Sequence, residues 1–178
     1  MVEIVVPDPS LVVLIGAAGV GKSTFASRHF RADEILSSDR YREIVSGDEA
    51  NQAATRTAFA RLHRDLRVRL AAGRLTVVDA TNVEGSARRS LLKVAHAAGV
   101  PAVAIVLDLP LETVLARNAA RSRKVDEEVV RRHVDRLRAS LGGTGRQLRD
   151  EGFAAVTVLR DPADVDRVVI RRGSAPQP

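Results

Sequence analysis

Nine residues, GAAGVGKST at positions 16–24, constrain this chain more than any other stretch, because they match the GxxxxGK[ST] pattern of a phosphate-binding loop. The apolar run LVVLI precedes the loop and FASRHF follows it, so a buried strand leads in and a helix leads out. Gly16, Gly19 and Gly21 let the backbone wrap closely around phosphate oxygens, with N–H groups pointing at the anion. The loop therefore predicts a site for a nucleoside triphosphate.

Three side chains of this loop carry expected roles. Lys22 is expected to span the outer phosphates, Ser23 to ligate Mg²⁺, and Thr24 to serve the α-phosphate or the start of the helix. The lysine is informative because nearly every other cation of the chain is an arginine. We therefore expect ATP, or another nucleoside triphosphate donor, together with Mg²⁺.

Short apolar runs alternate with longer amphipathic stretches along the whole chain. Strands are predicted at 11–15, 34–38, 75–81, 101–110 and 154–159, and helices from 22 onward and at 48–72, 86–99, 111–122, 126–141, before 151 and at 161–172. This alternation is typical of βαβ units on a parallel sheet, so we predict one α/β domain over 1–172. The small and polar tail GSAPQP (173–178) reads as a linker to further modules of a longer protein.

Composition narrows the class of protein. The 178 residues suit a single domain, and the absence of cysteine excludes disulfides and thiolate metal sites. No apolar run approaches the roughly 20 residues of a membrane span, so we expect a cytoplasmic protein without membrane contact. The net charge of +6 favours a polyanionic partner such as nucleic acid, although a coding bias toward arginine would raise it equally.

Two common classes of P-loop protein are disfavoured. A guanine-specific GTPase needs an Asn-Lys-x-Asp element, and none of Asn51, Asn82 and Asn118 is followed by lysine. Motors and AAA-type ATPases usually follow the strand-end aspartate with a glutamate that activates water, whereas Ala80 follows Asp79 here. Water is therefore not the expected acceptor of the terminal phosphate.

Asp39 is the candidate general base. It follows the predicted second strand in SSDRYR, at the edge where parallel α/β sheets bind ligands. A kinase acting on a hydroxyl needs a carboxylate to orient the nucleophile and accept its proton, while a turn or helix-capping role fits the residue equally well. Arg42, three residues on, could hold an acceptor phosphate or orient Asp39, and Arg40 could do the same. Tyr41 is expected to make a core or edge contact, with stacking on a base as the alternative.

Asp79 ends the strand LTVVD and is expected to reach Mg²⁺ directly or through water. Thr81 and Asn82 follow at the same edge of the sheet, where they could bind the acceptor or a metal-bound water. A strand-to-helix turn capped by these residues is the alternative.

Arginines follow the fourth predicted strand. Arg117 and Arg121 are four residues apart, which would place them on one face of a helix, and Arg123 begins the next loop. In P-loop kinases this segment is a mobile lid whose guanidinium groups neutralise the transferring phosphate. A solvated helix face is the alternative. His29, His63, His96 and His133 are dispersed without metal-ligand spacing.

Taken together, these motifs closely resemble the 5′-OH polynucleotide kinase module of bacterial polynucleotide kinase-phosphatases, which heal and seal RNA ends. The resemblance runs from about residue 5 to 172 and rests on SLVVLIGAAGVGKSTFA, SSD followed by Arg42, LTVVDATN, and the R-x-x-x-R of RNAAR. It implies a P-loop phosphotransferase fold whose five strands lie in the order 2-3-1-4-5, and an N-terminal module with phosphatase and ligase modules downstream.

The resemblance also implies roles for individual residues. Lys22 and Ser23 would serve ATP and Mg²⁺, Asp39 would be the base for the 5′-hydroxyl of RNA or DNA, and Arg42 would position the acceptor. The lid arginines, Arg117 and Arg121, would clamp phosphates. Two alternatives stay open, namely a kinase of a small-molecule hydroxyl and a non-catalytic module that binds nucleotide and nucleic acid.

Overall fold

A five-stranded parallel sheet forms the centre of the protein, whose computed structural model describes residues 1–46 and 55–173. The strands lie in the order β3-β4-β2-β5-β6. Their bounds are β2 (Leu11–Gly16), β3 (Ile35–Ser37), β4 (Thr76–Asp79), β5 (Ala102–Leu107) and β6 (Ala155–Leu159). All five coincide with predicted strands, and the order is the expected 2-3-1-4-5 when these five are numbered along the chain, so the predicted fold is confirmed.

Helices cover both faces of this sheet. The helices are α1 (Lys22–His29), the short 3-10 helix η1 (Ala32–Glu34), α2 (Ser38–Ser46), α3 (Thr55–Ala71), α4 (Gly85–Ala97), α5 (Leu111–Ala119), α6 (Glu127–Leu141), α7 (Arg146–Glu151) and α8 (Pro162–Asp166). The strand period of two sends alternate side chains of β2 to opposite faces. Val12 and Leu14 pack with Phe25 of α1, whereas Val13 packs with Leu62 of α3.

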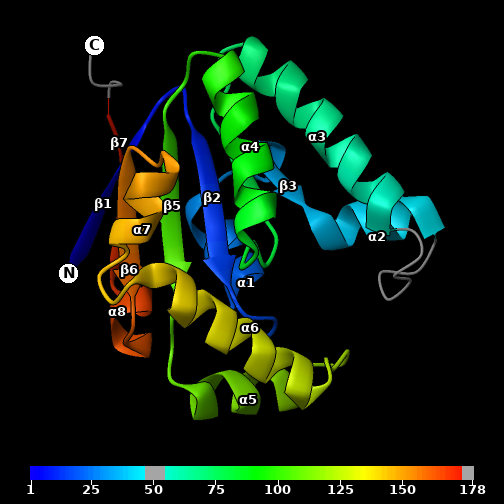
Figure 1. Cartoon of the computed structure of the whole chain (residues 1–178), viewed down its shortest axis with the longest axis vertical. Coiled ribbons are helices and arrows are strands. Elements are labelled where there is room, and N and C mark those ends of the chain that lie inside the picture. Colours follow the sequence, from blue (N-terminus) through cyan, green and yellow to red (C-terminus); the bar gives the residue numbers. More distant parts are fainter. Residues whose placement is uncertain (47–54, 174–178) are drawn as a thin grey trace.

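The carboxyl ends of the strands all point toward α5 and α6, which lie together beyond one end of the sheet (Figure 1). Because the strands are parallel, the loops that follow β2, β3 and β4 converge at this same edge. The phosphate-binding loop, the segment around Asp39 and the residues after Asp79 are thereby brought together.

A second sheet of two strands is absent from the sequence prediction. β1 (Val2–Pro7) pairs in parallel with β7 (Val168–Gly173) along their full lengths. The predicted helix over 161–172 is therefore wrong beyond Asp166, where α8 ends. The helix does begin as expected, with Asp161 as its N-cap and Pro162 in its first turn. The chain then turns extended because a partner strand from the other end of the sequence is available to it.

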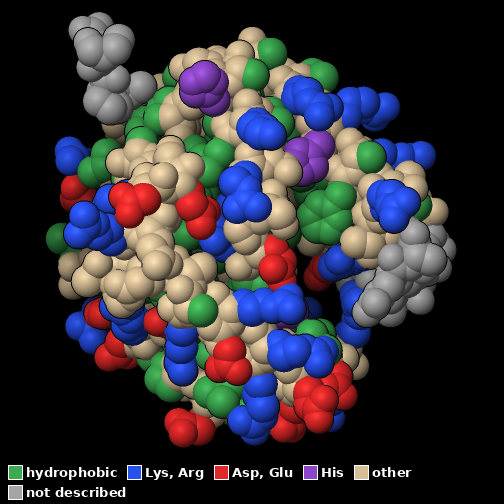
Figure 2. All heavy atoms as spheres, in the orientation of Figure 1, with side chains coloured by type: hydrophobic (Ala, Val, Ile, Leu, Met, Phe, Trp, Pro, Cys, Tyr) green, Lys and Arg blue, Asp and Glu red, His purple; other side chains and the backbone are tan. Residues whose placement is uncertain are grey.

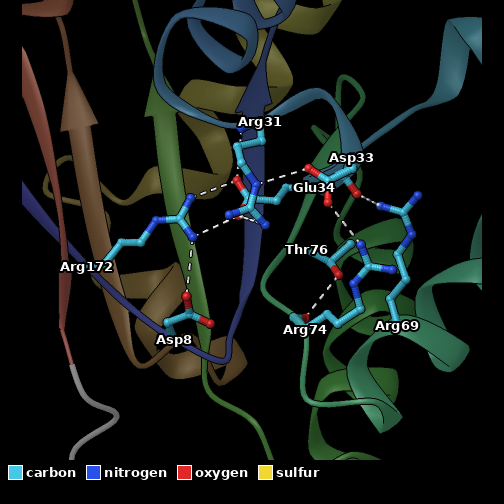
Figure 3. A network of polar contacts seen from close by, with 8 residues as sticks. All are labelled: Asp8, Arg31, Asp33, Glu34, Arg69, Arg74, Thr76 and Arg172. Carbon is cyan, nitrogen blue, oxygen red and sulfur yellow. Dashed lines mark hydrogen bonds and ion pairs between the residues drawn. The ribbon is translucent and has the colours of Figure 1, made fainter.

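Ion pairs fasten this small sheet to the main body. Arg172 of β7 pairs with Glu34 at 2.8 Å and with Asp8 at 3.3 Å (Figure 3). Burial acts against the charge of Glu34, but the hydrogen bond from Arg172 and that from the backbone N–H of Arg31 outweigh it and lower its pKa. Asp33, next to Glu34, pairs with Arg31 and with Arg74 before β4. The network links β7 to η1 and to the entry of β4.

Two predictions reach beyond the described residues. Part of the predicted helix over 48–72 lies in 47–54, outside them, and the described part is α3. β7 includes Gly173, the first residue of the predicted tail, while 174–178 also lie outside them. The linker therefore stays a prediction. Within 1–46 and 55–173, no helix is both long and apolar enough to cross a membrane.

Candidate active site

The phosphate-binding loop connects β2 to α1 as predicted. The N-cap of α1 is Gly21, and no side chain caps the helix at this end. The first backbone N–H groups of α1 therefore remain open to a ligand. The φ of Gly21, 108°, belongs to the region that favours glycine. Gly19 also has a positive φ, and a Cβ on it would lie 2.9 Å from the Cβ of Asn118. The close approach of α5 to the loop therefore requires glycine here.

The loop forms one wall of a cavity of about 670 Å³. Figure 2 shows a hollow on this side of the molecule, with Lys or Arg and Asp or Glu side chains at its rim. Most of the residues that the sequence predicted for the site line the cavity, namely Gly19, Gly21, Lys22, Ser23, Thr24, Asp39, Arg42, Asp79, Arg117, Arg121 and Arg123. Gly16 does not. It lies at the end of β2, where a Cβ would meet the carbonyl oxygen of Leu107 at 3.0 Å.

Lys22 is buried in the free protein. Its Nζ donates hydrogen bonds to the carbonyl oxygens of Gly16 at 2.9 Å and Ala17 at 2.8 Å. Burial lowers its pKa from 10.5 to about 8, against the attraction of Asp79 and Asp39 and together with repulsion from Arg121. The lysine is therefore held at the loop and desolvated, and no carboxylate of the described residues pairs with it directly. An anionic phosphate bound at the loop would supply the missing negative charge.

Ser23 and Asp79 form the candidate magnesium site. The Oγ of Ser23 donates a hydrogen bond to Oδ2 of Asp79 at 2.7 Å. Burial raises the pKa of Asp79, opposed by this hydrogen bond and by Lys22. A hydroxyl and a carboxylate are oxygen ligands of the kind Mg²⁺ prefers. Among the described residues no three His, Cys, Asp or Glu side chains are arranged so that they could hold a metal ion together, so the ion would draw its other ligands from phosphate and water.

Asp39 and Arg42 face the loop from α2. β3 ends at Ser37, one residue before the predicted strand end at 38, so Asp39 lies two residues past the strand, in the first turn of α2. The helix spacing of three residues brings the guanidinium of Arg42 onto Oδ1 of Asp39. Both side chains line the cavity. An arginine thus holds the candidate base at the edge of the sheet where the predicted base was expected.

The two residues between them point elsewhere. The hydroxyl of Tyr41 donates to Oδ2 of Asp65 on α3 at 2.6 Å, and the ring packs on the apolar cluster beneath that helix. The expected core or edge contact of Tyr41 is confirmed. Arg40 is exposed and does not line the cavity.

The segment that carries Arg117, Arg121 and Arg123 lines the cavity together with the loop, but its geometry differs from the expected one. α5 ends at Ala119, so the prediction that one helix carries both Arg117 and Arg121 is wrong. Arg117 lies in the last turn and donates from Nη1 to the carbonyl oxygen of Val20 in the loop at 2.7 Å. Arg121 lies beyond the helix and still lines the cavity, as does Arg123.

Asn118 explains how the segment after α5 is held, and sequence reasoning missed it. Its Nδ2 donates to the carbonyl oxygen of Val125 at 2.7 Å, and its Oδ1 accepts from the N–H of the same residue at 3.0 Å. This pair of bonds closes the turn that carries Arg121 and Arg123. Asn118 lies inside the RNAAR motif, and this position is the sequence signal that could have identified it.

His133 was also missed as a site residue. It lies on α6, lines the cavity, and its Nδ1 accepts from the N–H of Ala18 in the loop at 3.4 Å. Burial and the charge of Lys22 lower its pKa. Val129, one turn before His133, lines the same cavity. The spacing of four residues places both on one face of α6, and this spacing is the sequence signal that could have indicated the cavity-facing side of the helix.

Thr81 and Asn82 divide between the two alternatives. Thr81 lines the cavity, and its carbonyl oxygen accepts from the N–H of Gly16. Asn82 is buried with a φ of 51° and donates from Nδ2 to the carbonyl oxygen of Leu14 at 2.8 Å. Within the turn that follows Asp79, Asn82 therefore has a structural role, whereas Thr81 is accessible to a ligand in the cavity.

Comparisons with known proteins give the family and the fold of this chain. The AAA_33 family model, described as an AAA domain, matches residues 11–143. The L-seryl-tRNA(Sec) kinase of Methanococcus maripaludis is 29% identical over 133 residues, 68% of this chain and 49% of that protein. The chain therefore spans about half the length of this curated relative.

Solved structures share the fold at lower identity. The Pnkp1/Rnl/Hen1 RNA repair complex matches with a TM-score of 0.67 and 19% identity, over 78% of this chain and 47% of that one. The shikimate kinase of Acinetobacter baumannii, solved with shikimate, matches with a TM-score of 0.55 and 20% identity, over 89% and 88%. The family match covers well over half of the chain, and two of the three proteins named are kinases. This chain belongs to the AAA_33 family and has the α/β fold of P-loop kinases.

Proposed function

We propose that this kinase transfers the γ-phosphate of ATP to the 5′-hydroxyl of an RNA or DNA end, in nucleic-acid end repair. The observation that carries the proposal is the arrangement of one cavity. Asp39, held by Arg42, lines the same cavity as the buried Lys22, the Ser23–Asp79 pair, Arg117 at the end of α5, and Arg121.

In the proposed reaction the chain positions donor and acceptor in line. The loop N–H groups and Lys22 bind the outer phosphates, while Ser23 and Asp79 would hold Mg²⁺, which would neutralise charge on the phosphate oxygens. Asp39 accepts the proton of the 5′-hydroxyl as that oxygen forms its bond to phosphorus and the bond to ADP breaks. Arg117 and Arg121 stabilise the charge that spreads over the transferring group.

Further support comes from the kind of acceptor that the relatives' names specify. The relative from Methanococcus maripaludis is named as a kinase of seryl-tRNA, and one of the fold matches belongs to an RNA repair complex. The net charge of +6 suits a polyanionic acceptor. We further propose that residues 1–172 act as one module beside phosphatase and ligase modules of a longer protein.

A small-molecule hydroxyl is the second candidate acceptor. A cavity of about 670 Å³ falls within the range of sites for small ligands, and it must also hold the triphosphate. A sugar, a nucleoside or an antibiotic could reach Asp39 in the same way as a terminal nucleotide.

An acceptor panel tests the proposal. ADP release would be followed with ATP, Mg²⁺ and, in turn, 5′-OH oligoribonucleotide, 5′-OH oligodeoxyribonucleotide, nucleoside, gluconate and shikimate. The proposal expects kcat/KM for an oligonucleotide to exceed that for every small hydroxyl. A small hydroxyl that gives the highest kcat/KM would establish the second candidate instead.

A further inference from the structure

A second hollow lies next to the candidate active site, between α3 and α4. It is a groove of about 710 Å³, lined from α3 by Phe59, Ala60, His63, Arg67 and Ala71, and from α4 and the turn after it by Ser90, Lys93, Val94, Ala97 and Ala98. Residues 59, 63, 67 and 71 follow one another at the i, i+4 spacing of a single helix face. Figure 1 shows the two helices close together where both end, near the top of the view, and splayed apart toward their N-terminal ends.

Phe59 connects this groove to the catalytic cavity. It lines both hollows, and within the catalytic cavity it shares the wall with Asp39 and Arg42. An acceptor whose end lies at Asp39 would therefore pass Phe59 as it leaves the cavity and enter the groove. The aromatic ring offers a stacking surface for a nucleobase at this junction.

The charge of the two helices selects the kind of molecule that fits. α3 carries five arginines and one carboxylate, Asp65, and that carboxylate is engaged by the hydroxyl of Tyr41. α4 carries Arg88, Arg89 and Lys93 and no carboxylate. Arg88 is buried against Glu151, but Lys93 and Arg67 are exposed where they line the groove. A polyanion is complementary to this surface.

We infer that the groove between α3 and α4 binds the single-stranded segment that follows the 5′-terminal nucleotide of a polynucleotide acceptor. The inference rests on the proposed function and adds to it the substrate class, a strand rather than a nucleoside. From Phe59 to Ala71 the helix rises about 18 Å, the length of about five stacked nucleotides. Arg67 and Lys93 contact backbone phosphates, and the alanines between them leave room for sugars and bases.

Two double variants of equal charge test the groove by direct binding. A 3′-fluorescent 5′-OH RNA 10-mer is titrated, by anisotropy, with wild type, with Arg67→Ala/Lys93→Ala, and with Arg61→Ala/Arg64→Ala as the control on α3. Each phosphate contact of a single strand contributes about −0.7 to the salt slope, so the groove variant should lose about 1.4 in slope and about 25-fold in affinity at 0.1 M salt. The control variant should keep an affinity and a salt slope close to those of wild type.

A second readout separates the groove from the proposed function. Phosphate transfer to the 10-mer and to adenosine 3′-phosphate, which is too short to leave the cavity, is measured with the same proteins. The groove variant should lose activity on the 10-mer and keep its kcat/KM on the nucleotide. If wild type binds the 10-mer through the groove yet labels neither acceptor, the kinase proposal fails and the groove stands.

Three results would contradict the proposed role of the groove. The two double variants could lose equal affinity for the 10-mer, or the groove variant could bind the 10-mer as tightly as wild type does. An acidic peptide could also displace the 10-mer as effectively as unlabelled RNA at the same concentration of charge. The last result would assign the surface to a protein partner.

Discussion

The state of Lys22 predicts an unusual pH dependence for ATP binding. Burial lowers the pKa of this lysine to about 8 in the free protein, so it is about 90% protonated at pH 7 and about 10% protonated at pH 9. The bound triphosphate supplies the opposite charge that the free site lacks, and the lysine of the complex stays protonated through this range. Raising the pH from 7 to 9 should therefore weaken ATP binding about tenfold, or about 1.4 kcal/mol.

Calorimetry would measure both consequences. ATP is titrated into the protein at pH 7 and pH 9, in buffers of different ionisation enthalpy, so that the number of protons taken up on binding is obtained with the Kd. We expect an uptake of about 0.1 proton at pH 7 and about 0.9 at pH 9, from the same pKa of about 8. The histidines whose pKa values are shifted titrate below this range, because their shifts are downward.

The variant Lys22→Met provides the control, because any remaining pH dependence then belongs to another group. An unchanged Kd between pH 7 and pH 9, with no proton uptake at pH 9 in wild type, would refute the reasoning. Such a result would mean that the carboxylates of Asp79 and Asp39 offset the burial of Lys22 in the free protein.

Three further predictions concern the parts that support the site. Asn118→Ala removes both hydrogen bonds to Val125 and should cost about 2 kcal/mol, with faster hydrogen exchange in 120–125; unchanged exchange there would contradict the role of the clamp. Gly19→Ala meets both a positive φ and a contact at 2.9 Å, so it should cost about 1–3 kcal/mol in thermal unfolding and weaken ATP binding, whereas wild-type values would show that the loop adapts. Arg172→Met leaves the buried Glu34 with one cation fewer and should cost about 1–2 kcal/mol in urea unfolding at pH 7. Because the pKa of Glu34 is lowered on folding, its contribution is present above its unfolded pKa and is lost as the pH falls through the folded value, so a loss that is as large at pH 3 as at pH 7 would contradict this assignment.

The sheet and most of the site could be predicted because their signals are local. Buried strands such as 11–15 and 101–110 are short apolar runs, and the strand order is the one that the resemblance to P-loop kinases implies. The positions of Lys22, Ser23 and Asp79 relative to the sheet edge follow from the loop and the parallel strands. Their convergence is a property of the fold class and needs no knowledge of side-chain packing.

The strand β7 shows where local signals end. Residues 168–172, VVIRR, follow a correctly placed helix start and are compatible with its continuation. They become a strand because β1, more than 160 residues earlier, pairs with them from Val2 to Pro7. Both strands also place side chains on the main core, including Ile4 and Val168. A single-sequence pattern does not contain that pairing.

Within the site, the missed features are contacts between distant segments. The bond from Arg117 to Val20 joins residues 97 apart in sequence, and the one from Ala18 to His133 joins residues 115 apart. The depressed pKa of Lys22 likewise depends on burial beneath several elements. For Asn82 the sequence left ligand binding and a capped turn equally open, and the structure decides for the turn, because the φ of Asn82 is positive and its amide reaches β2.

The most direct test of the central claim is the fate of the labelled terminal phosphate of ATP. Wild type and Asp39→Asn are incubated with γ-labelled ATP, Mg²⁺ and matched RNA and DNA oligonucleotides that end in 5′-OH or 5′-phosphate, and the products are digested to locate the label. The account predicts label on the 5′-terminal nucleotide of the 5′-OH strands alone, lowered at least about 100-fold in Asp39→Asn while ATP binding is retained. Undiminished transfer by Asp39→Asn, or no label on any oligonucleotide while ATP still binds, would contradict it.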